Sequence, residues 1–173
     1  MGKLSGEYDH VWSDDPALVT TVTRQKCDKD GKPLTANDGS PIMETVANPA
    51  FDFQGWIDRG DDALLCIREG EKPHRFTLRH LTGRARIRLE DLIDQSGGEA
   101  TREVMYEACS LALVRWALGT SNGVPDACRR VVERKVERVA EDVMESLYAV
   151  HGGSLVWELG LRAIQGMAPD PKP

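Results

Sequence analysis

The first third of the chain is polar, and its few apolar residues group into two strand-like runs. β-Branched residues dominate 18–27, and a shorter apolar run covers 42–46, so we expect a strand in each. The intervening 28–33 segment contains Gly31 and Pro33, which is typical of a turn. Residues 1–50 therefore predict an extended β-hairpin arm.

A second pair of strand-like runs lies between residues 63 and 80. Residues 64–67 form a continuous apolar run, and 75–79 alternate, with Phe76 and Leu78 on one face and arginines on the other. The polar connection between the runs contains Gly70 and Pro73. A short connection of this kind favours a central β-hairpin over 63–80.

From Thr82 onward the apolar positions recur at helical spacing. Thr82 is a candidate N-cap, and Gly97, Gly119 and Gly152 are placed to end helices. The predicted helices cover about 83–95, 99–118, 125–150 and 154–167. In the third helix, apolar residues spaced three or four apart predict a narrow helix–helix contact stripe, made of Val132, Val136, Val139, Val143, Leu147 and Val150.

These elements predict an α+β fold. We expect the N-terminal hairpin arm (1–50) and the central hairpin to pack on a C-terminal bundle of about four helices, with a core domain over 51–168 and a tail over 169–173. A chain of 173 residues is long enough for one domain with a sizeable core. No apolar run approaches the ~20 residues of a membrane span, so we expect no membrane contact.

The net charge is −6, yet one segment is strongly basic. We call it the basic patch; within 68–88 it consists of Arg68, Lys72, Arg75, Arg79, Arg84, Arg86 and Arg88. Three interpretations remain open: a solvated surface, a docking surface for another protein, or a contact with phosphates. The overall negative charge and the lack of neighbouring aromatic residues make nucleic acid the least favoured partner.

No local motif indicates catalysis, a cofactor or a metal. The Asp28–Gly31 string lacks the glycine and glutamate positions of a calcium loop and is interpreted as a turn. We interpret His74 and His80 as surface residues rather than a metal pair, and the acidic residues of the third helix as a solvated face: Glu141, Asp142 and Glu145. The cysteines show no zinc spacing and are expected to be free and buried, as in a reducing cytoplasm: Cys27, Cys66, Cys109 and Cys128.

Two strings carry a resemblance to a known group of proteins. The first is FTLRHLTGRARIRLEDLID at 76–94, and the second is ALVRWALGTSNG, in which 113–116 match. Together they resemble small proteins of the structural-gene modules of tailed bacteriophages and prophages. The resemblance implies a non-enzymatic virion component or tail-assembly chaperone, located in the virion or the host cytoplasm. It also implies other phage structural proteins, or further copies of the chain, as partners.

Two functions are therefore expected. The first is a phage structural or assembly protein that acts through protein–protein contacts in the morphogenesis of a tail, neck or head. The alternative is a small regulatory protein that binds nucleic acid through the basic patch.

Overall fold

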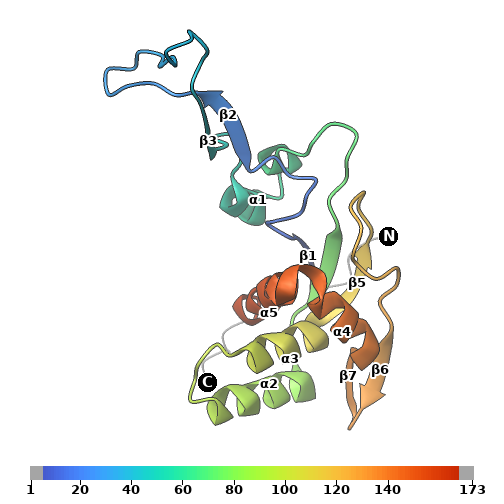
Figure 1. The fold of residues 1–173 in the computed structure, drawn as a ribbon. Helices are drawn as coiled ribbons and strands as arrows, with labels where there is room; N and C mark the ends of the chain where they lie inside the picture. Colours follow the sequence, from blue (N-terminus) through green and yellow to red (C-terminus); the bar gives the residue numbers. More distant parts are fainter. Residues whose placement is uncertain (1–5, 168–173) are drawn as a thin grey trace. The chain divides into compact units, whose positions relative to one another are not determined.

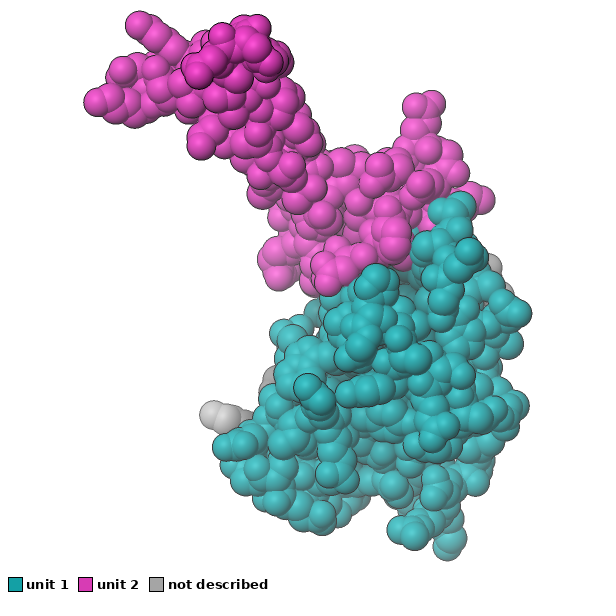
Figure 2. Space-filling model, viewed as in Figure 1, with its two compact units in different colours: residues 1–12, 73–173 teal, residues 13–72 magenta. Residues whose placement is uncertain are grey.

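The computed structural model describes residues 6–167 and has an α+β fold. The chain forms two compact units, coloured teal and magenta in Figure 2. Among the described residues, the larger unit comprises 6–12 and 73–167, and the smaller unit is Ser13–Lys72. The expected tail, 169–173, and the first five residues of the expected arm lie outside the described residues.

The larger unit is built on a three-stranded antiparallel sheet with the strand order β1-β4-β5 (Figure 1). Its strands are β1 (Glu7–Val11), β4 (Arg75–Arg79) and β5 (Leu113–Ala117). Val11 lies opposite Arg75 in the register, so the chain leaves this sheet and returns to it at neighbouring positions. Phe76 and Leu78 of β4 are fully buried, which is the alternation that the sequence predicts.

Four α-helices and a second hairpin complete the larger unit. The helices are α2 (Gly83–Gln95), α3 (Arg102–Ala112), α4 (Glu141–Tyr148) and α5 (Ser154–Gln165), with the 3-10 turn η2 (Val150–Gly153) between the last two. The hairpin consists of β6 (Arg130–Glu133) and β7 (Val136–Val139). The core gathers around α3, in which eight of eleven residues are buried.

Helices α3 and α5 pack unusually closely, as their neighbouring ribbons in Figure 1 show. Gly160 of α5 lies directly over the α3 backbone: a Cβ atom at this position would come within 2.2 Å of the Met105 carbonyl oxygen. Buried Ala108 and Ala163 also keep the interface narrow. Small residues at a helix crossing let the two backbones approach, so Gly160 sets the distance between these helices.

The smaller unit contains a hairpin and two short helical segments: β2 (Thr21–Gln25), β3 (Met43–Ala47), α1 (Phe53–Arg59) and η1 (Asp62–Leu65). Its few buried apolar residues are Ala17, Leu18, Trp56 and Leu65. Asp52 caps α1 by accepting a hydrogen bond from the Gly55 amide at 2.9 Å, and the Trp56 indole N–H donates to Asp62 at 3.1 Å. The predicted hairpin within the arm is confirmed, since β2 pairs antiparallel with β3. Glu7–Val11, which the prediction also placed in the arm, instead forms β1 in the sheet of the larger unit.

The predicted central hairpin over 63–80 is wrong. Asp61 accepts a hydrogen bond from the Ala63 amide and starts a 3-10 turn at Asp62–Leu65, so the apolar run is not a strand. Cys66 then adopts a left-handed conformation that ends this turn. The predicted strand at 75–79 exists as β4, but it pairs with β1 and β5 instead.

The predicted helix over 125–150, with its valine contact stripe, is also wrong. The segment forms β6, β7 and the shorter α4. Its tight turn is made by Arg134 and Lys135, both with positive φ, where hairpins usually place Asn and Gly. The predicted helix over 99–118 ends early, because the chain continues from Ala112 directly into β5. The helices predicted over 83–95 and 154–167 are confirmed as α2 and α5.

Candidate interaction groove

The residues of the basic patch have different surroundings. Arg68 and Lys72 belong to the smaller unit and the other five residues to the larger one. Arg68 lies 3.8 Å from Glu71, Arg86 lies 2.7 Å from Glu90 and Arg88 lies 2.6 Å from Glu107. Within residues 6–167, Arg84 is an exposed member of the patch for which the structure shows no ion pair. The patch is therefore partly neutralised by local acids.

Arg79 holds the fold together rather than facing a partner. Its guanidinium donates to the carbonyl oxygens of Leu111 at 3.3 Å and Glu137 at 3.1 Å, and it pairs with the Glu137 carboxylate at 3.1 Å. Arg130 reaches the same carboxylate at 3.2 Å and donates to the Leu111 and Leu113 carbonyls. Two arginines thus bind carbonyls at the C-terminus of α3, where a positive charge is favourable.

The pKa of Glu137 is affected by both Arg79 and Arg130. Partial burial raises the pKa of Glu137, but the nearby Arg130 and Arg79 outweigh it and lower the pKa below its usual value of 4.5. Burial and the neighbouring Arg79 lower the pKa of Arg130, against the opposing effect of Glu137. Glu137 is therefore an ionised link that joins β7 to β4 and β6.

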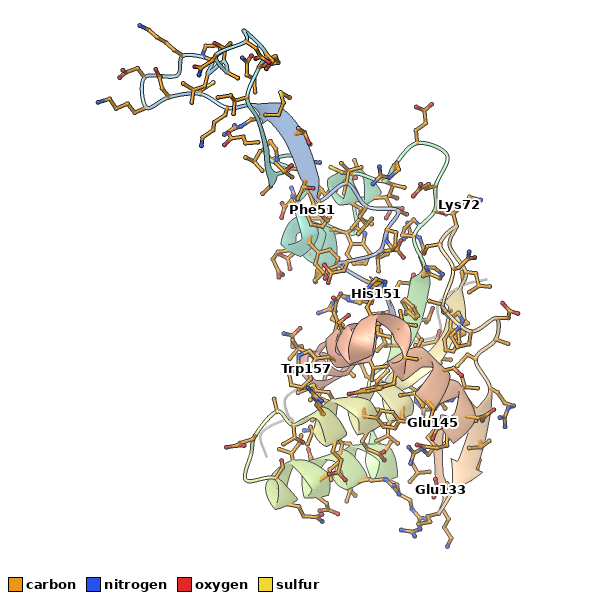
Figure 3. The ribbon with its side chains drawn as sticks, viewed as in Figure 1. Phe51, Lys72, Glu133, Glu145, His151 and Trp157 are labelled. Atoms are coloured by element: carbon orange, nitrogen blue, oxygen red, sulfur yellow. The ribbon has the colours of Figure 1, made fainter. Side chains whose placement is uncertain are left out.

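A groove opens between α2, α3 and the β6–β7 hairpin. It has a volume of about 720 Å³, and eight of its thirteen lining residues carry an ionisable acid or guanidinium group. α2 contributes Arg84, Ile87, Arg88, Asp91, Leu92 and Gln95; α3 contributes Glu103, Tyr106 and Glu107; the rest are Arg134, Val136, Arg138 and Glu141. Glu133, labelled in Figure 3, ends β6 next to the turn that carries Arg134.

The floor of the groove is a network of paired charges around Glu107. This buried carboxylate accepts a hydrogen bond from Arg88 at 2.6 Å and lies 3.2 Å from Arg138. Arg138, itself 7 % exposed, also donates to the Ser110 hydroxyl at 3.1 Å and lies 3.4 Å from Glu133 and 3.5 Å from Glu141. Because each buried charge has several partners, the floor is held in one arrangement.

Tyr106 joins this floor as a hydrogen-bond donor. Its hydroxyl donates to Glu141 at 2.8 Å. Partial burial and the adjacent Glu141 raise the pKa of Tyr106 well above its usual value of 10. The phenol therefore stays protonated at neutral pH, which suits a structural role rather than nucleophilic chemistry.

The rim of the groove differs from its floor, because its charges have no ion pair within the described residues. These charges are Arg84, Asp91, Glu103 and Arg134, all exposed and of both signs. Ile87 lies among them and is 57 % exposed, which makes it one of the largest apolar surfaces on α2. A surface that combines an exposed aliphatic side chain with uncommitted charges of both signs is suited to binding a protein segment.

The other residues singled out in the sequence lie elsewhere. His74 is buried, which corrects its assignment as a surface residue: its ring nitrogen lies 3.2 Å from the Ser121 hydroxyl. His80 is exposed and contacts the Gly166 carbonyl. Within the described part of the chain, no group of three or more His, Cys, Asp or Glu side chains is placed to hold a metal ion.

The acidic residues expected on a solvated face are exposed on α4, but two of them have partners. Glu141 binds Tyr106 and Arg138, and Asp142 binds Arg129, whose hydrogen bond lowers the pKa of Asp142. The free cysteines differ in burial: Cys109 is buried, Cys66 and Cys128 are half-buried, and Cys27 is exposed. The expectation of burial is therefore confirmed for Cys109 and wrong for Cys27. Cys27 lies in the segment 21–50, in which no side chain is buried.

The residues that build the groove were missed by sequence reasoning, apart from Arg84 and Arg88. Glu107 and Arg138 are far apart in the chain, so no local spacing indicates their pairing. Ile87 did carry a signal, since it is an apolar residue on the polar face of a predicted helix.

Among residues 6–167, no helix is both long and apolar enough to cross a membrane. Comparisons of the chain with protein-family models, with curated proteins and with solved structures find no match, so the groove is interpreted from its own chemistry.

Proposed function

We propose that this chain is a non-enzymatic assembly protein that binds a helical segment of another protein in the groove between α2, α3 and the β6–β7 hairpin. The observation that carries the proposal is the contrast between a paired, rigid floor and an unpaired rim. The resemblance of 76–94 and 113–116 to phage structural-module proteins supports a setting in tail, neck or head morphogenesis.

The lining favours a protein segment over a small molecule. Small-molecule pockets are mostly apolar, with a few polar groups that fix the orientation of the ligand. Here eight of thirteen lining residues are arginines or carboxylic acids. A partner that brings its own charged side chains can pair with the rim, whereas a small apolar ligand would leave it unpaired.

The balance of charge favours protein over nucleic acid. The lining holds four arginines and four acids, so its formal charge is zero. A phosphate backbone would meet Asp91 and Glu103 as well as Arg84 and Arg134, and like charges oppose binding. The alternative function, nucleic-acid binding through the basic patch, is further weakened because several of its arginines are paired with acids.

The rim also indicates the chemistry of the occupant. Arg84, Ile87 and Asp91 lie three and four residues apart on α2, so they share one helix face. An amphipathic helix that lies in a groove presents residues at the same spacing. We therefore expect a helix with an apolar residue against Ile87, an acidic residue near Arg84 or Arg134, and a basic residue near Asp91 or Glu103.

The test is capture of the structural proteins of the same phage or prophage, offered one at a time to the immobilised full chain. Ile87→Asp and Asp91→Lys should weaken capture by about tenfold or more, the effect expected for a central contact. Matched controls are Val132→Asp, because Val132 is 74 % exposed and outside the groove, and Asp94→Lys on the same helix. Both controls should bind normally.

Two results would contradict the proposal. In the first, none of the structural proteins is captured by the wild-type chain. In the second, the groove variants bind as well as their controls. Binding to plain duplex DNA that weakens steeply with salt and is lost in Arg84→Glu would instead support the alternative function.

A further inference from the structure

The hairpin arm, which we define as residues 21–50, contains no buried side chain. Its order comes from backbone hydrogen bonds and turns. The β2–β3 ladder is extended at its far end by bonds from Lys26 to Ile42 at 2.7 Å and from Leu34 to Lys26 at 2.8 Å. A two-stranded hairpin on its own is marginally stable in water, so a segment of this kind gains from a further strand.

Both edges of the β2–β3 sheet are open. In the described part of the chain, no third strand pairs with β2 or β3, as Figure 1 shows. The Lys26 amide donates to the Ile42 carbonyl, and the Asn48 amide donates to the Thr20 carbonyl. These two bonds show which residues of β2 and β3 direct their N–H and C=O groups toward the other strand. By alternation, the backbone N–H and C=O groups of Thr45 point away from β2, and those of Thr23 point away from β3.

The two faces of this sheet differ in charge. Arg24 and Glu44 lie on one face and pair with each other at 3.0 Å. The other face consists of uncharged residues that lie opposite one another in the register: Thr21 and Ala47, Thr23 and Thr45, Gln25 and Met43. Natural edge strands are usually protected by unpaired charges, prolines or bulges. Here the only charges on the strands neutralise each other, and the ladder has no bulge.

We propose that β3 pairs antiparallel with β3 of a second copy of this chain, which joins two hairpin arms into a four-stranded sheet. A register centred on Thr45 places this residue opposite itself, Met43 opposite Ala47, and Glu44 opposite Val46. No like charges meet in this register. The outward N–H and C=O groups of Thr45 then bond to those of the second copy, which satisfies the open edge.

β3 is the pairing edge rather than β2, because pairing at this edge buries more of the exposed apolar surface of the arm. Ile42 and Met43 are 39 % and 52 % exposed, and they are the large exposed apolar residues of the smaller unit within the described chain. The free edge of β2 carries Thr21, Thr23 and Gln25 instead.

Net charge points the same way. The hairpin arm holds four basic and four acidic residues, so it is neutral, whereas the whole chain carries −6. Two neutral arms can meet without like-charge repulsion at their contact, which favours a second copy as the occupant of this edge.

The test compares proline at the two open edges. Thr45→Pro removes an outward N–H from β3 without removing a β2–β3 bond, and Thr23→Pro makes the same change on β2. In sedimentation equilibrium of the full chain up to about 100 μM, the wild type and Thr23→Pro should be dimers. Thr45→Pro should raise the dimer dissociation constant by about a hundredfold, as expected when two backbone hydrogen bonds are lost.

A covalent measurement guards against a proline variant that misfolds. Thr45→Cys in a Cys27→Ser background should form a covalent dimer with a short bis-maleimide, since the introduced thiols of the two copies would lie side by side. The matched Thr23→Cys protein should not. A wild type that stays monomeric at every concentration would overturn the proposal, and so would equal cross-linking or equal dissociation at the two edges. Loss of the dimer would leave capture in the groove unchanged, so the two proposals fail independently.

Discussion

Helix α3 and the hairpin arm show two different ways of ordering a chain. In α3, eight of eleven residues are buried, and α2, α5 and β7 pack against it. In the hairpin arm, no side chain is buried between residues 21 and 50. Side-chain packing therefore fixes the first region, and backbone hydrogen bonds with turn residues fix the second. Stability should depend on the larger unit, while the arm remains available for association.

The largest expected effect comes from the α3–α5 crossing. Gly160→Leu places a side chain where even a Cβ atom would lie 2.2 Å from the Met105 carbonyl oxygen, so the larger unit should lose cooperative unfolding. Gly160→Ala should lower the free energy of unfolding by about 1–3 kcal/mol, the usual cost of overpacking. Thermal denaturation followed by circular dichroism measures both. An Ala variant as stable as the wild type would show that the helices can separate freely.

The next effect concerns the charge network under the groove. Glu107→Ala leaves Arg88 and Arg138 without their shared buried acid and should cost about 3 kcal/mol. Glu133→Ala removes another partner of Arg138, but this side chain is half exposed and should cost less than about 1 kcal/mol. Urea denaturation of both variants makes the comparison. Equal losses would mean that burial of the network does not matter.

A smaller difference in stability is expected between variants of Arg79 and Arg84, which both belong to the basic patch. Arg79→Glu removes contacts to Leu111 and Glu137 and should cost about 2 kcal/mol. Arg84→Glu changes an exposed side chain in the first turn of α2 and should stay within about 0.5 kcal/mol of the wild type. If Arg79→Glu is as stable as Arg84→Glu, the contacts of Arg79 with the C-terminal end of α3 contribute nothing measurable to the free energy of unfolding.

The same contacts predict a modest dependence on pH. Because the pKa of Glu137 lies below its usual value of 4.5 in the folded chain, its contribution is complete above pH 4.5. It is lost as the pH falls through the folded value. Glu137→Gln should therefore flatten the fall of stability with acid below pH 4.5, measured by denaturant melts at several pH values. An unchanged acid profile would count against the role of this carboxylate.

The smallest effect is expected in the hairpin arm. Replacing 26–42 by an Asn-Gly turn removes no buried residue and should leave the melting temperature of the larger unit unchanged. In the intact chain, hydrogen exchange should be much faster at amides of the arm than in α3. A large drop in melting temperature on shortening would show that the two regions depend on each other.

The elements that the sequence predicted correctly are those whose ends are marked locally. α2 follows Thr82, which occupies the N-cap position without a side-chain hydrogen bond, and it ends before the Gly97-Gly98 pair. The turn at 28–32 is fixed by the Asp28 carboxylate, which accepts two amide hydrogen bonds at 2.9 Å. The β6–β7 turn carried no such mark, since Arg134 and Lys135 are rare in that conformation. With no visible turn, the valines at helical spacing predicted one long helix.

Long-range partners explain the remaining errors. β1 became a strand because β4 lies beside it, although 68 residues separate Asp9 from Thr77. The hydrophobic run at 64–67 was predicted as the partner of β4 because it was the nearest candidate in sequence. The same limit applies to the groove: Arg88 and Ile87 are visible in the sequence, but only the fold brings Arg138 to Glu107. Likewise, only the fold shows that Arg88 of the basic patch pairs with Glu107.

The register in which Val11 faces Arg75 has a consequence for how this chain can change over time. Relative to the three-stranded sheet, residues 12–74 therefore form one long loop whose two ends are paired in the register. The entropy of closing a loop grows only slowly with its length, so inserting or removing residues between 13 and 72 costs the sheet little. This segment, which includes the hairpin arm, can thus be lengthened or shortened while the sheet of the larger unit keeps its structure.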